Sequence, residues 1–380
     1  MEFSRILNLP KLLEKKSFFL FGPRSTGKSY LIRSQLSDGL LIDLLDGDTF
    51  LRLSAHPSEL EAIVAADATG RCVIIDEIQK VPLLLDQVHR IIENQKRTFL
   101  LTGSSARKLK RGAANLLAGR AWQANLFSLV YPEIPNFNLE TYLRFGGLPI
   151  VVLSSAPHEE LRAYVRTYLY EEIQAEGIVR KIPQFARFLQ SAALSNAQLL
   201  NFANISSDSG VSASTVREYY AILEDTLVGF FVQPWLHSKK RKAIATAKFY
   251  FFDTGVVHTL ANTKTLDRNS DLYGQSFEHW IAMELRAFIN YHRKAEELTF
   301  WRSVNGQEVD FVIGDQLAIE VKATKTVSNR DLNSLRAFQE ENIVKQFFCV
   351  SQDPLIRKVD GILCLPWQEF LAGLWQEEWF

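Results

Sequence analysis

The sequence has few cysteines, no excess of charge of either sign and no hydrophobic run long enough to cross a membrane. Its three cysteines, Cys72, Cys349 and Cys364, lie far apart inside apolar runs and lack the spacing of a metal site. We expect them to be small core residues in a reducing compartment. No charged segment followed by a long apolar run opens the chain, which predicts a soluble cytoplasmic protein without membrane contact.

Charge and length limit the classes of function and the number of domains. Lysine plus arginine and aspartate plus glutamate both number 43, so contact with nucleic acid has to come from local patches. The 380 residues, 47% of them hydrophobic, suffice for several domains with their own cores. We predict three domains, spanning residues 1–150, 151–262 and 263–380.

The segment 21–30, FGPRSTGKSY, has the spacing of a phosphate-binding loop. Gly22 is followed after four residues by Gly27, Lys28 and Ser29, between an apolar run and a helical start. The glycines let backbone N–H groups point inward, and the next helix N-terminus favours negative charge. We predict an ATP site in which Lys28 reaches the outer phosphates and Ser29 binds Mg²⁺, a glycine-rich turn being the alternative. The predicted nucleotide-binding residues are Gly22, Pro23, Arg24, Ser25, Thr26, Gly27, Lys28, Ser29 and Tyr30.

Two acids end the next buried strand. The segment 72–80, CVIIDEIQK, has the β-branched run of a strand covered on both faces and ends in Asp76 and Glu77. At the carboxyl end of such a strand, both side chains can face the crevice where α/β sheets hold ligands. We predict that Asp76 binds Mg²⁺ and that Glu77 polarises the attacking water in ATP hydrolysis.

A further apolar run, in RTFLLTGSSARKL, ends in hydroxyls. It predicts a strand beside the acidic one that places Ser104 or Ser105 near the γ-phosphate, although a serine-rich turn fits the residues equally well. In NLLAGRAW, Arg120 is our candidate for an arginine finger supplied by a neighbouring subunit, and a solvated basic face is the alternative. Four more cations precede it without an intervening acid: Arg107, Lys108, Lys110 and Arg111.

Residues 198–225 predict a helix, a turn at 210–212 and a second, amphipathic helix. Four apolar positions of the second helix are expected to face inward: Val216, Tyr219, Tyr220 and Leu223. Ser214, Thr215 and Arg217 are candidates for DNA contact. So few basic or amide groups argue against specific reading of bases.

Two strand-like runs follow, VGFFVQPW and AKFYFFD, separated by LHSKKRKAIAT. This interval resembles the wing of a winged helix. Its tip carries cations that suit phosphate contact without sequence reading, although a solvated loop is the alternative. They are Lys239, Lys240, Arg241 and Lys242.

Residues 298–324 carry a second chemical signal. Two tight-turn dipeptides, NG and GD, predict three antiparallel strands. A three-residue loop at 314–316 places Asp310 opposite Glu320, whereas a two-residue loop makes them diagonal neighbours; Lys322 shares the strand face of Glu320. Such a set suits a metal-dependent phosphodiesterase in which the two acids hold Mg²⁺ and Lys322 orients hydroxide. A surface ladder of ion pairs is the alternative.

Taken in order, several segments resemble a widespread bacterial and archaeal group of AAA ATPases with a carboxy-terminal domain that looks nuclease-like. They are FGPRSTGKS, IIDEIQ, LLTGSSARKL, LAGRAW, YLRFGGLP, LRAYVRTYLYEEI, YFFDTG, FEHW, EVDF and IEVK. The resemblance implies an AAA-type core, a winged-helix segment and a restriction-endonuclease-like terminus. It also implies that Glu278 is the extra acid of a PD-(D/E)xK pattern with Asp310, Glu320 and Lys322, although Val309 stands where the namesake has proline.

We therefore expect an α/β protein: a P-loop AAA-type parallel-sheet domain, a helical and winged-helix segment and an α/β nuclease-like domain. The expected activity is ATP hydrolysis with Mg²⁺, coupled to binding or remodelling of DNA, branched DNA included, with metal-dependent cleavage as a further activity. Because Arg120 acts only from a neighbour, we expect a homo-oligomer, a hexameric ring being one form. The alternatives are a nucleotide-switched interaction module with a non-catalytic nuclease-like domain and a protein-remodelling ATPase.

Overall fold

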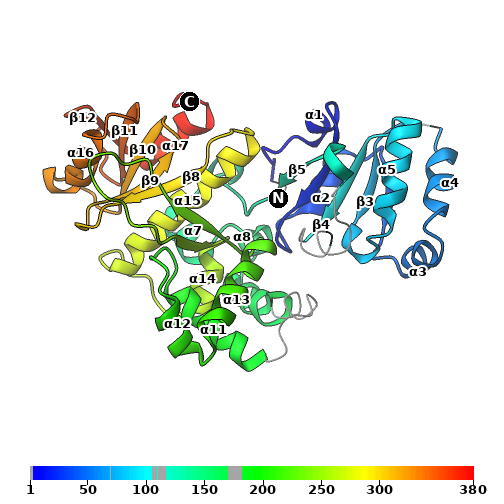
Figure 1. The fold of residues 1–380 in the computed structure, drawn as a ribbon, viewed down its shortest axis with the longest axis horizontal. Helices are drawn as coiled ribbons and strands as arrows, with labels where there is room; N and C mark the ends of the chain where they lie inside the picture. Colours follow the sequence, from blue (N-terminus) through cyan, green and yellow to red (C-terminus); the bar gives the residue numbers. More distant parts are fainter. Residues whose placement is uncertain (1–2, 69, 105–108, 110–116, 170–181) are drawn as a thin grey trace. The chain divides into compact units, whose positions relative to one another are not determined.

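The computed structural model describes residues 3–68, 70–104, 109, 117–169 and 182–380 and divides into two compact units (Figure 1). The first unit comprises Met1–Leu129 and Ala221–Val228, and the second comprises Val130–Tyr220 and Gly229–Phe380. Each unit has a β-sheet of its own with helices against it, which confirms the predicted α/β class. In these ranges, no helix is both long and apolar enough to span a bilayer. The predicted domain limits at residues 150 and 262 stay predictions.

The sheet of the first unit is parallel and has the strand order β2-β3-β4-β1-β5. Its strands are β1 Ser17–Phe21, β2 Leu40–Asp43, β3 Val73–Asp76, β4 Phe99–Gly103 and β5 Ala121–Asn125. Every residue of β1, β3 and β4 is buried, as expected for a parallel sheet covered on both faces. This confirms the predicted parallel P-loop sheet. Because β4 lies between β1 and β3, its carboxyl end separates the loop after β1 from the acids of β3.

Among the described residues, five helices accompany this sheet. They are α1 Leu9–Leu13, α2 Lys28–Gln35, α3 Gly47–Ala55, α4 Glu59–Ala66 and α5 Leu84–Gln95. Leu60 of α4 and Val88 of α5 are fully buried in one cluster with Phe19 and Leu101 of the sheet. The apolar faces of α4 and α5 therefore cover one side of the sheet. The carboxyl ends of its strands lie next to α2 and the loops.

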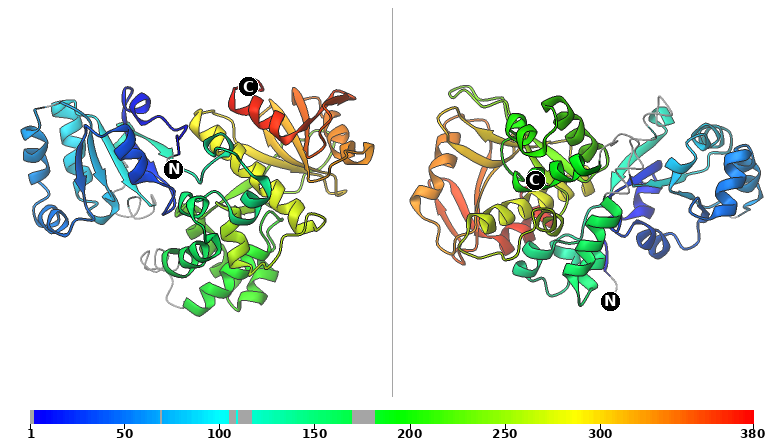
Figure 2. Two further views of the ribbon diagram at one scale, coloured as in Figure 1. Left: turned by 180° about the vertical axis from the view of Figure 1, so that it is seen from behind. Right: turned by 90° about the horizontal axis from the view of Figure 1, so that it is seen from below.

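The second unit contains a mixed sheet of eight strands in the order β12-β13-β11-β10-β9-β8-β6-β7. Its carboxy-terminal strands are coloured yellow to red in Figure 2. Its strands are β6 Gly229–Pro234, β7 Lys248–Phe251, β8 Leu298–Arg302, β9 Glu308–Ile313, β10 Leu317–Lys322, β11 Gln346–Ser351, β12 Arg357–Val359 and β13 Ile362–Pro366. Strands β8, β9 and β10 are antiparallel, as predicted. The β6–β7 hairpin, which we expected to be a wing, continues the same sheet because Gln233 pairs with Thr299.

Helices cover both faces of this sheet. On β9, Val312 and its neighbour Ile313 belong to separate clusters, because successive strand residues point to opposite faces. The cluster of Ile313 contains α15, Asp271–Tyr291, and α17, Trp367–Trp375, whereas that of Val312 contains α16, Asn333–Gln339. Strands β9 and β10 are therefore buried on both faces.

The described residues of the second unit outside this sheet are largely helical. They form α7 Leu139–Phe145, α8 Pro149–Leu153, α9 Pro157–Ala163, the π-helical turn η4 Tyr164–Leu169, α11 Ile182–Leu194, α12 Phe202–Ser209, α14 Thr254–Leu260 and the first part of α13 Ala213–Asp225, whose residues from Ala221 onward belong to the first unit. The predicted helix, turn and second helix are present as α12 and α13, and Gly210 ends α12 at φ 68°. The four positions expected to face inward are all buried: Val216, Tyr219, Tyr220 and Leu223.

A buried carboxylate lies in the middle of α15. Glu284 is completely buried and accepts hydrogen bonds from the backbone N–H of Tyr131 at 2.7 Å, from Trp280 Nε1 at 3.1 Å and from Trp375 Nε1 at 2.9 Å. Burial raises the pKa of Glu284 from 4.5 to about 8 against the effect of these donors. The side chain is therefore a neutral acid at most physiological pH values.

We predict that Glu284 makes the protein less stable as the pH rises. Between about pH 5 and pH 8, folded Glu284 keeps a proton that the unfolded chain has released, so the free energy of unfolding falls by about 1 kcal/mol per pH unit. Glu284→Gln removes this titration, although the amide imposes its own constant cost. Urea unfolding at a series of pH values should show a shallower slope for the variant; equal slopes would contradict the prediction.

Candidate functional site

The loop after β1 has the backbone of a phosphate cradle. Gly27 has φ 93° and immediately precedes α2, and Ser25 also has a positive φ of 63°. A Cβ at Gly22 would overlap the carbonyl oxygen of Leu126, so only glycine fits there. The predicted glycines therefore stand where the backbone turns and where it approaches a neighbouring segment closely.

Lys28 lies folded over this loop. Its Nζ donates to the carbonyl oxygens of Gly22 at 2.6 Å and Pro23 at 3.1 Å, and Thr26 Oγ1 also donates to Pro23 at 2.8 Å. Arg5, which the sequence did not single out, braces the loop from outside by donating to the carbonyl oxygen of Thr26 at 2.7 Å. The buried ammonium is thus held against the backbone of the loop.

The remaining loop residues differ in exposure. Arg24 and Ser25 are half-buried, whereas the side chain of Tyr30 is 42% exposed. Tyr30 therefore belongs to the outer surface of α2. The roles predicted for these three residues in nucleotide binding stay predictions.

Asp76 joins two hydroxyl groups at the end of β3. Ser29 Oγ of α2 donates to Asp76 Oδ2 at 3.3 Å, and Thr102 Oγ1 of β4 donates to Asp76 Oδ1. A hydroxyl and a carboxylate therefore meet next to the phosphate loop, and hard oxygen ligands of this kind fit Mg²⁺. Thr102 was missed, although its place in LLTGS, at the end of an apolar run, was a signal for it.

Glu77 is held in an uncommon backbone conformation directly after β3. Its φ is 58°, and its backbone N–H donates to Thr102 Oγ1 at 3.2 Å. Gln79 Nε2 donates to Glu77 Oε2 and lies 3.5 Å from Ser104 Oγ. A Cβ at Gly103 would overlap Gln79 Oε1, which is buried and has no hydrogen-bond partner among the described residues. Gln79 therefore connects the predicted water-activating acid with the predicted sensor.

Arg120 forms an ion pair within its own chain. Its Nε contacts Glu93 Oε1 of α5, and this hydrogen bond lowers the pKa of Glu93. The Arg120 side chain is 33% exposed, and its role as a finger acting on a neighbouring subunit stays a prediction. Five residues named with it lie outside the described part of the chain: Ser105, Arg107, Lys108, Lys110 and Arg111.

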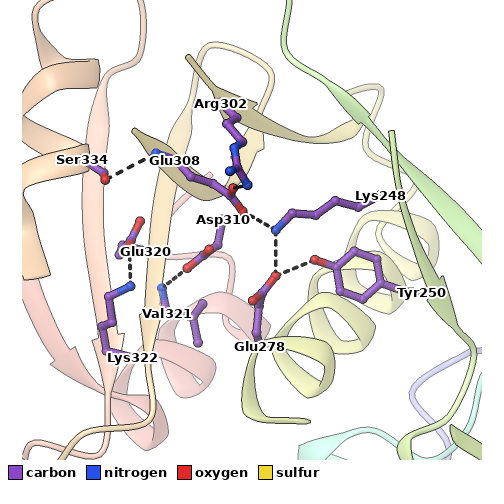
Figure 3. Close-up of polar contacts among 10 residues, drawn as sticks. All are labelled: Lys248, Tyr250, Glu278, Arg302, Glu308, Asp310, Glu320, Val321, Lys322 and Ser334. Atoms are coloured by element: carbon purple, nitrogen blue, oxygen red, sulfur yellow. Dashed lines mark hydrogen bonds and ion pairs between the residues drawn. The ribbon is translucent and has the colours of Figure 1, made fainter. Parts of the chain in front are cut away.

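The second unit gathers the acids predicted at its carboxy-terminal site (Figure 3). Ile319 pairs with Phe311, so the loop has the three-residue form that sets Glu320 opposite Asp310. Asp310 Oδ2 accepts from the backbone N–H of Val321 at 2.8 Å, and Lys322 Nζ donates to Glu320 Oε1 at 2.5 Å. The strand-face prediction for Asp310, Glu320 and Lys322 therefore agrees with the pairing.

A β-bulge lies at Asp310. Trp301 pairs with Val309 and Thr299 with Val312, so a longer step on β9 faces a shorter step on β8. Asp310 lies within that longer step. Bulges of this kind turn side chains next to functional sites, and nothing in the local sequence pattern indicated this one.

Glu278 is bound by residues that the sequence had not assigned to this site. Lys248 Nζ of β7 lies 3.0 Å from Glu278 Oε1 and 2.6 Å from Glu308 Oε1 (Figure 3). Tyr250, two residues along the same strand face, donates to Glu278 Oε1 at 2.6 Å. Lys248 is buried and therefore acts as an internal counterion for two acids. A lysine inside the otherwise apolar run KFYF was the available signal.

Four acids, Glu278, Glu308, Asp310 and Glu320, form an acidic cluster whose negative charges are only partly balanced by nearby cations. Burial, followed by the charge of Glu278, raises the pKa of Asp310 to about 7, and burial together with Asp310 raises that of Glu320 well above its usual range. Burial alone would lower the pKa of Lys248, but Glu278 and other nearby groups raise it well above its ordinary value. Glu320 Oε2 is buried and has no hydrogen-bond partner within the described ranges. The pair Asp310 and Glu320 is therefore where an added cation would be stabilised.

These two carboxylates fit one hard cation. Among the described residues, no group of three or more His, Cys, Asp or Glu side chains is arranged to hold a metal ion. Glu278 is instead occupied by Lys248 and Tyr250. The residues present thus offer Mg²⁺ two acids at this site and not three.

The predicted DNA-contact residues fall into two groups. On α13, Ser214 and Arg217 are exposed and Thr215 is half-buried. In the basic loop, the side chains of Lys239, Lys240 and Lys242 are exposed, whereas Arg241 pairs with Glu340 at 2.9 Å.

We predict that Lys248 is required to keep the acidic cluster folded. Lys248→Met leaves Glu278 and Glu308 without their shared counterion, and removing one partner of a buried pair costs about 3 to 5 kcal/mol. The half-exposed pair of Lys345 and Asp315, 3.6 Å apart, provides the control Lys345→Met, for which the cost should be under about 1 kcal/mol. Urea unfolding of both variants measures the difference; similar losses would contradict this role of Lys248.

Three family profiles match consecutive parts of the chain. Residues 14–135 match the family described as AAA domain. Residues 136–267 match a domain of unknown function (DUF8612), and residues 273–370 match another (DUF4143).

Two relatives show the extent of the similarity. An uncharacterized protein of Methanocaldococcus jannaschii, MJ1544, is 23% identical over 337 residues, which cover 80% of this chain and 73% of that protein. The crystal structure of a Signal Transduction ATPase with Numerous Domains (STAND) protein with a tetratricopeptide repeat sensor, PH0952 from Pyrococcus horikoshii, shares 16% identity. That similarity covers 73% of this chain and 46% of that one, with a TM-score of 0.22. The chain thus spans less than half the length of that protein. The phosphate loop, strand order and acids described above lie within residues 14–135, the part of the chain that is similar to the AAA domain family, and together they support a P-loop ATPase domain there.

Proposed function

We propose that the protein hydrolyses ATP with Mg²⁺ and couples this reaction to binding or remodelling of DNA by its second unit. The observation that carries the ATPase part is the hydrogen bonding of Asp76 to Ser29 and Thr102 beside the phosphate loop. Three elements, α2, β3 and β4, thus bring their polar ends to one place. That place is the sheet edge where α/β proteins hold ligands.

In this proposal the loop amides and Lys28 bind the phosphates, and Ser29 and Asp76 hold Mg²⁺. The metal ion, when bound, neutralises charge on the phosphates. Lys28 leaves the carbonyl oxygens of Gly22 and Pro23 for the ligand, since an ammonium gains more from a phosphate than from neutral carbonyl groups.

Glu77 takes the role of the group that orients and polarises water. Gln79 bonds Glu77 and lies near Ser104, so the acid has a defined position before any ligand arrives. A γ-phosphate near Ser104 would compete for these contacts, which makes Gln79 the residue that relates nucleotide state to the position of Glu77. Arg120, presented by a neighbouring subunit of a homo-oligomer, would stabilise charge on the γ-phosphate.

The basic loop supports the DNA part of the proposal. Glu341 is buried and accepts from the backbone N–H groups of Lys239 at 2.7 Å and Lys240 at 3.0 Å, which fixes the loop against α16. The loop therefore presents its exposed lysines as a fixed patch. Fixed ammonium groups suit contact with DNA phosphates irrespective of sequence.

The most specific part of the proposal is that the second unit cleaves DNA. In this reaction Asp310 and Glu320 hold Mg²⁺, and Lys322 lies beside them. The buried Glu320 Oε2, which accepts no hydrogen bond from the described residues, supports a cation there. The second candidate function is a nucleotide-switched ATPase that binds or remodels proteins through a non-catalytic nuclease-like domain. It is favoured by Lys248, which fills the space among Glu278 and Glu308 with an ammonium group.

We expect separate effects of Lys28 and Glu77 on ATP turnover. Lys28→Ala should abolish ATP binding at the phosphate loop, measured in calorimetry as the loss of one binding site, because the loop loses its cation. Glu77→Gln should keep binding but lower turnover by about 100-fold or more, the contribution of a positioned acid or base. Glu59→Gln, which removes an exposed acid paired with Arg52 at 2.9 Å, serves as the control. Normal turnover by Glu77→Gln would remove Glu77 from the mechanism.

We also predict how the exposed lysines of the basic loop contribute to DNA binding. Replacing Lys239, Lys240 and Lys242 by alanine should lower the slope of log affinity against log salt by about 0.9 for each DNA phosphate that the variant no longer neutralises. Replacing three exposed lysines elsewhere, Lys325, Lys345 and Lys358, should leave the slope unchanged. Equal slopes for the basic-loop variant and the unaltered protein would contradict DNA binding by this loop.

Cleavage is tested by incubating the protein with labelled linear, forked and four-way DNA, with and without ATP and Mg²⁺. The variant Asp310→Ala is treated in the same way. Identical cleavage products with Asp310→Ala would exclude the proposed nuclease site. ATP turnover stimulated by unfolded polypeptide and not by DNA would favour the second candidate.

A further inference from the structure

A cavity of about 880 Å³ lies in the second unit, away from the acidic cluster and from the basic loop. It is lined by α7, α9, η4, α11, α14 and the segment after α14. Five of its described lining residues are cations, Arg144, Arg162, Arg166, Arg187 and Lys264, and a single one, Glu159, is an acid. The chain as a whole is neutral, so this concentration of positive charge is local.

Two of the helices that line the cavity, α7 and α14, are held together by contacts between the end of α7 and the start of α14. Asp253 is completely buried; its carboxylate caps α14 through Gly255 N at 2.9 Å and accepts from Gly147 N at 2.9 Å. Gly146 has φ 75°, and a Cβ there would overlap Asp253, just as a Cβ at Gly255 would overlap the carbonyl oxygen of Phe145. Gly146 of the segment FGG and Gly255 of the segment DTG therefore have to be glycines, because any side chain there would collide with the other segment. They hold α7 and α14, and hence Arg144 and the α14 residues, in one arrangement.

The cations of the walls are oriented by contacts that use few of their donors. Arg144 NH2 lies 3.3 Å from His158 Nε2 and donates to the carbonyl oxygen of Lys264 at 3.3 Å. Arg187 Nε donates to the carbonyl oxygen of Ser209 at 3.2 Å. A guanidinium has five N–H donors, so both side chains keep donors for a ligand. Glu159 pairs with Arg162 at 3.1 Å and offsets only that charge.

Arg166 enters the wall from an unusual helical turn. The residues Tyr164–Leu169 form a π-helix directly after α9, and π-helical turns occur often at functional sites. Apolar side chains, among them Leu161, Val165 and Leu260, line the cavity beside the cations. The cavity therefore has charged walls for anionic groups and an apolar wall for a ring.

We propose that this cavity binds a phosphorylated small molecule of nucleotide size that carries at least two phosphate groups. Arginine forks bind phosphate oxygens in pairs, which explains four arginines where lysines would supply the same charge. The volume lies within the range of about 300 to 1,000 Å³ typical of small-molecule sites, whereas a DNA duplex needs an extended surface. The site is independent of the phosphate loop, so it does not depend on the ATPase proposal.

Calorimetry on the full chain carrying Lys28→Ala tests the proposal, because the phosphate loop is then disabled. We expect sodium tripolyphosphate and ATP each to bind once. Adding Arg166→Gln and Arg187→Gln should weaken the binding of both probes by roughly a hundredfold or more, since each of the two lost charge-assisted forks contributes at least about 1.4 kcal/mol, a factor of ten in affinity. Arg166→Lys with Arg187→Lys should give an intermediate loss, because charge remains but the fork is gone.

The control replaces two exposed arginines outside the cavity, Arg90→Gln and Arg330→Gln, and should leave both affinities unchanged. Unaltered thermal unfolding of the arginine variants shows that the fold is retained. Absence of heat with both probes overturns the proposal, as does equal weakening in the control. Binding of a DNA duplex that depends on Arg166 and Arg187, without binding of either small probe, would make the cavity part of a nucleic-acid surface and also overturn it.

Discussion

The carboxylate of Asp76 receives hydrogen bonds from hydroxyls on two different elements, and the polar site of the first unit depends on this convergence. Ser29 comes from the start of α2 and Thr102 from the end of β4. The strand order makes it possible, because β4 lies between the strand before the phosphate loop and the strand that carries the acid. A sheet in which β1 and β3 were neighbours would leave no place for Thr102 or for Ser104.

The second unit has to bury carboxylates next to a sheet, and it does so by dividing them between two ammonium groups. Lys248 forms ion pairs with Glu278 and Glu308, and Lys322 forms an ion pair with Glu320. A buried charge is tolerated only with such a partner. Asp310 accepts a hydrogen bond from a backbone N–H, and Glu320 keeps one oxygen that no described residue pairs. The imbalance is therefore concentrated at one pair of acids, where a cation would be most favourable.

The sequence predicted the features that repeat along the chain. Buried runs ending in polar residues predicted β1, β3 and β4, and helical spacing predicted the buried face of α13. The turn dipeptides predicted the antiparallel strands that carry Asp310 and Glu320 but left two registers open, of which the structure has the one with a three-residue loop. Contacts between distant segments could not be read in this way. Lys248 and Glu278 are separated by a helix and a loop, and Arg5 reaches Thr26 across α1 and β1. The bulge at Asp310 also lay beyond the sequence, because it depends on how β8 and β9 pair. The roles of these residues in catalysis and DNA contact stay predictions, since the fold positions side chains without showing what they bind.

The register of the β6–β7 hairpin in the large sheet has an electrostatic consequence. β7 begins directly at Lys248, and the hairpin follows α13 along the chain. A slip of β7 by one residue would turn Lys248 and Tyr250 to the opposite face of the strand and leave Glu278 without its counterion. The register of the β6–β7 hairpin therefore sets the electrostatic potential next to Asp310.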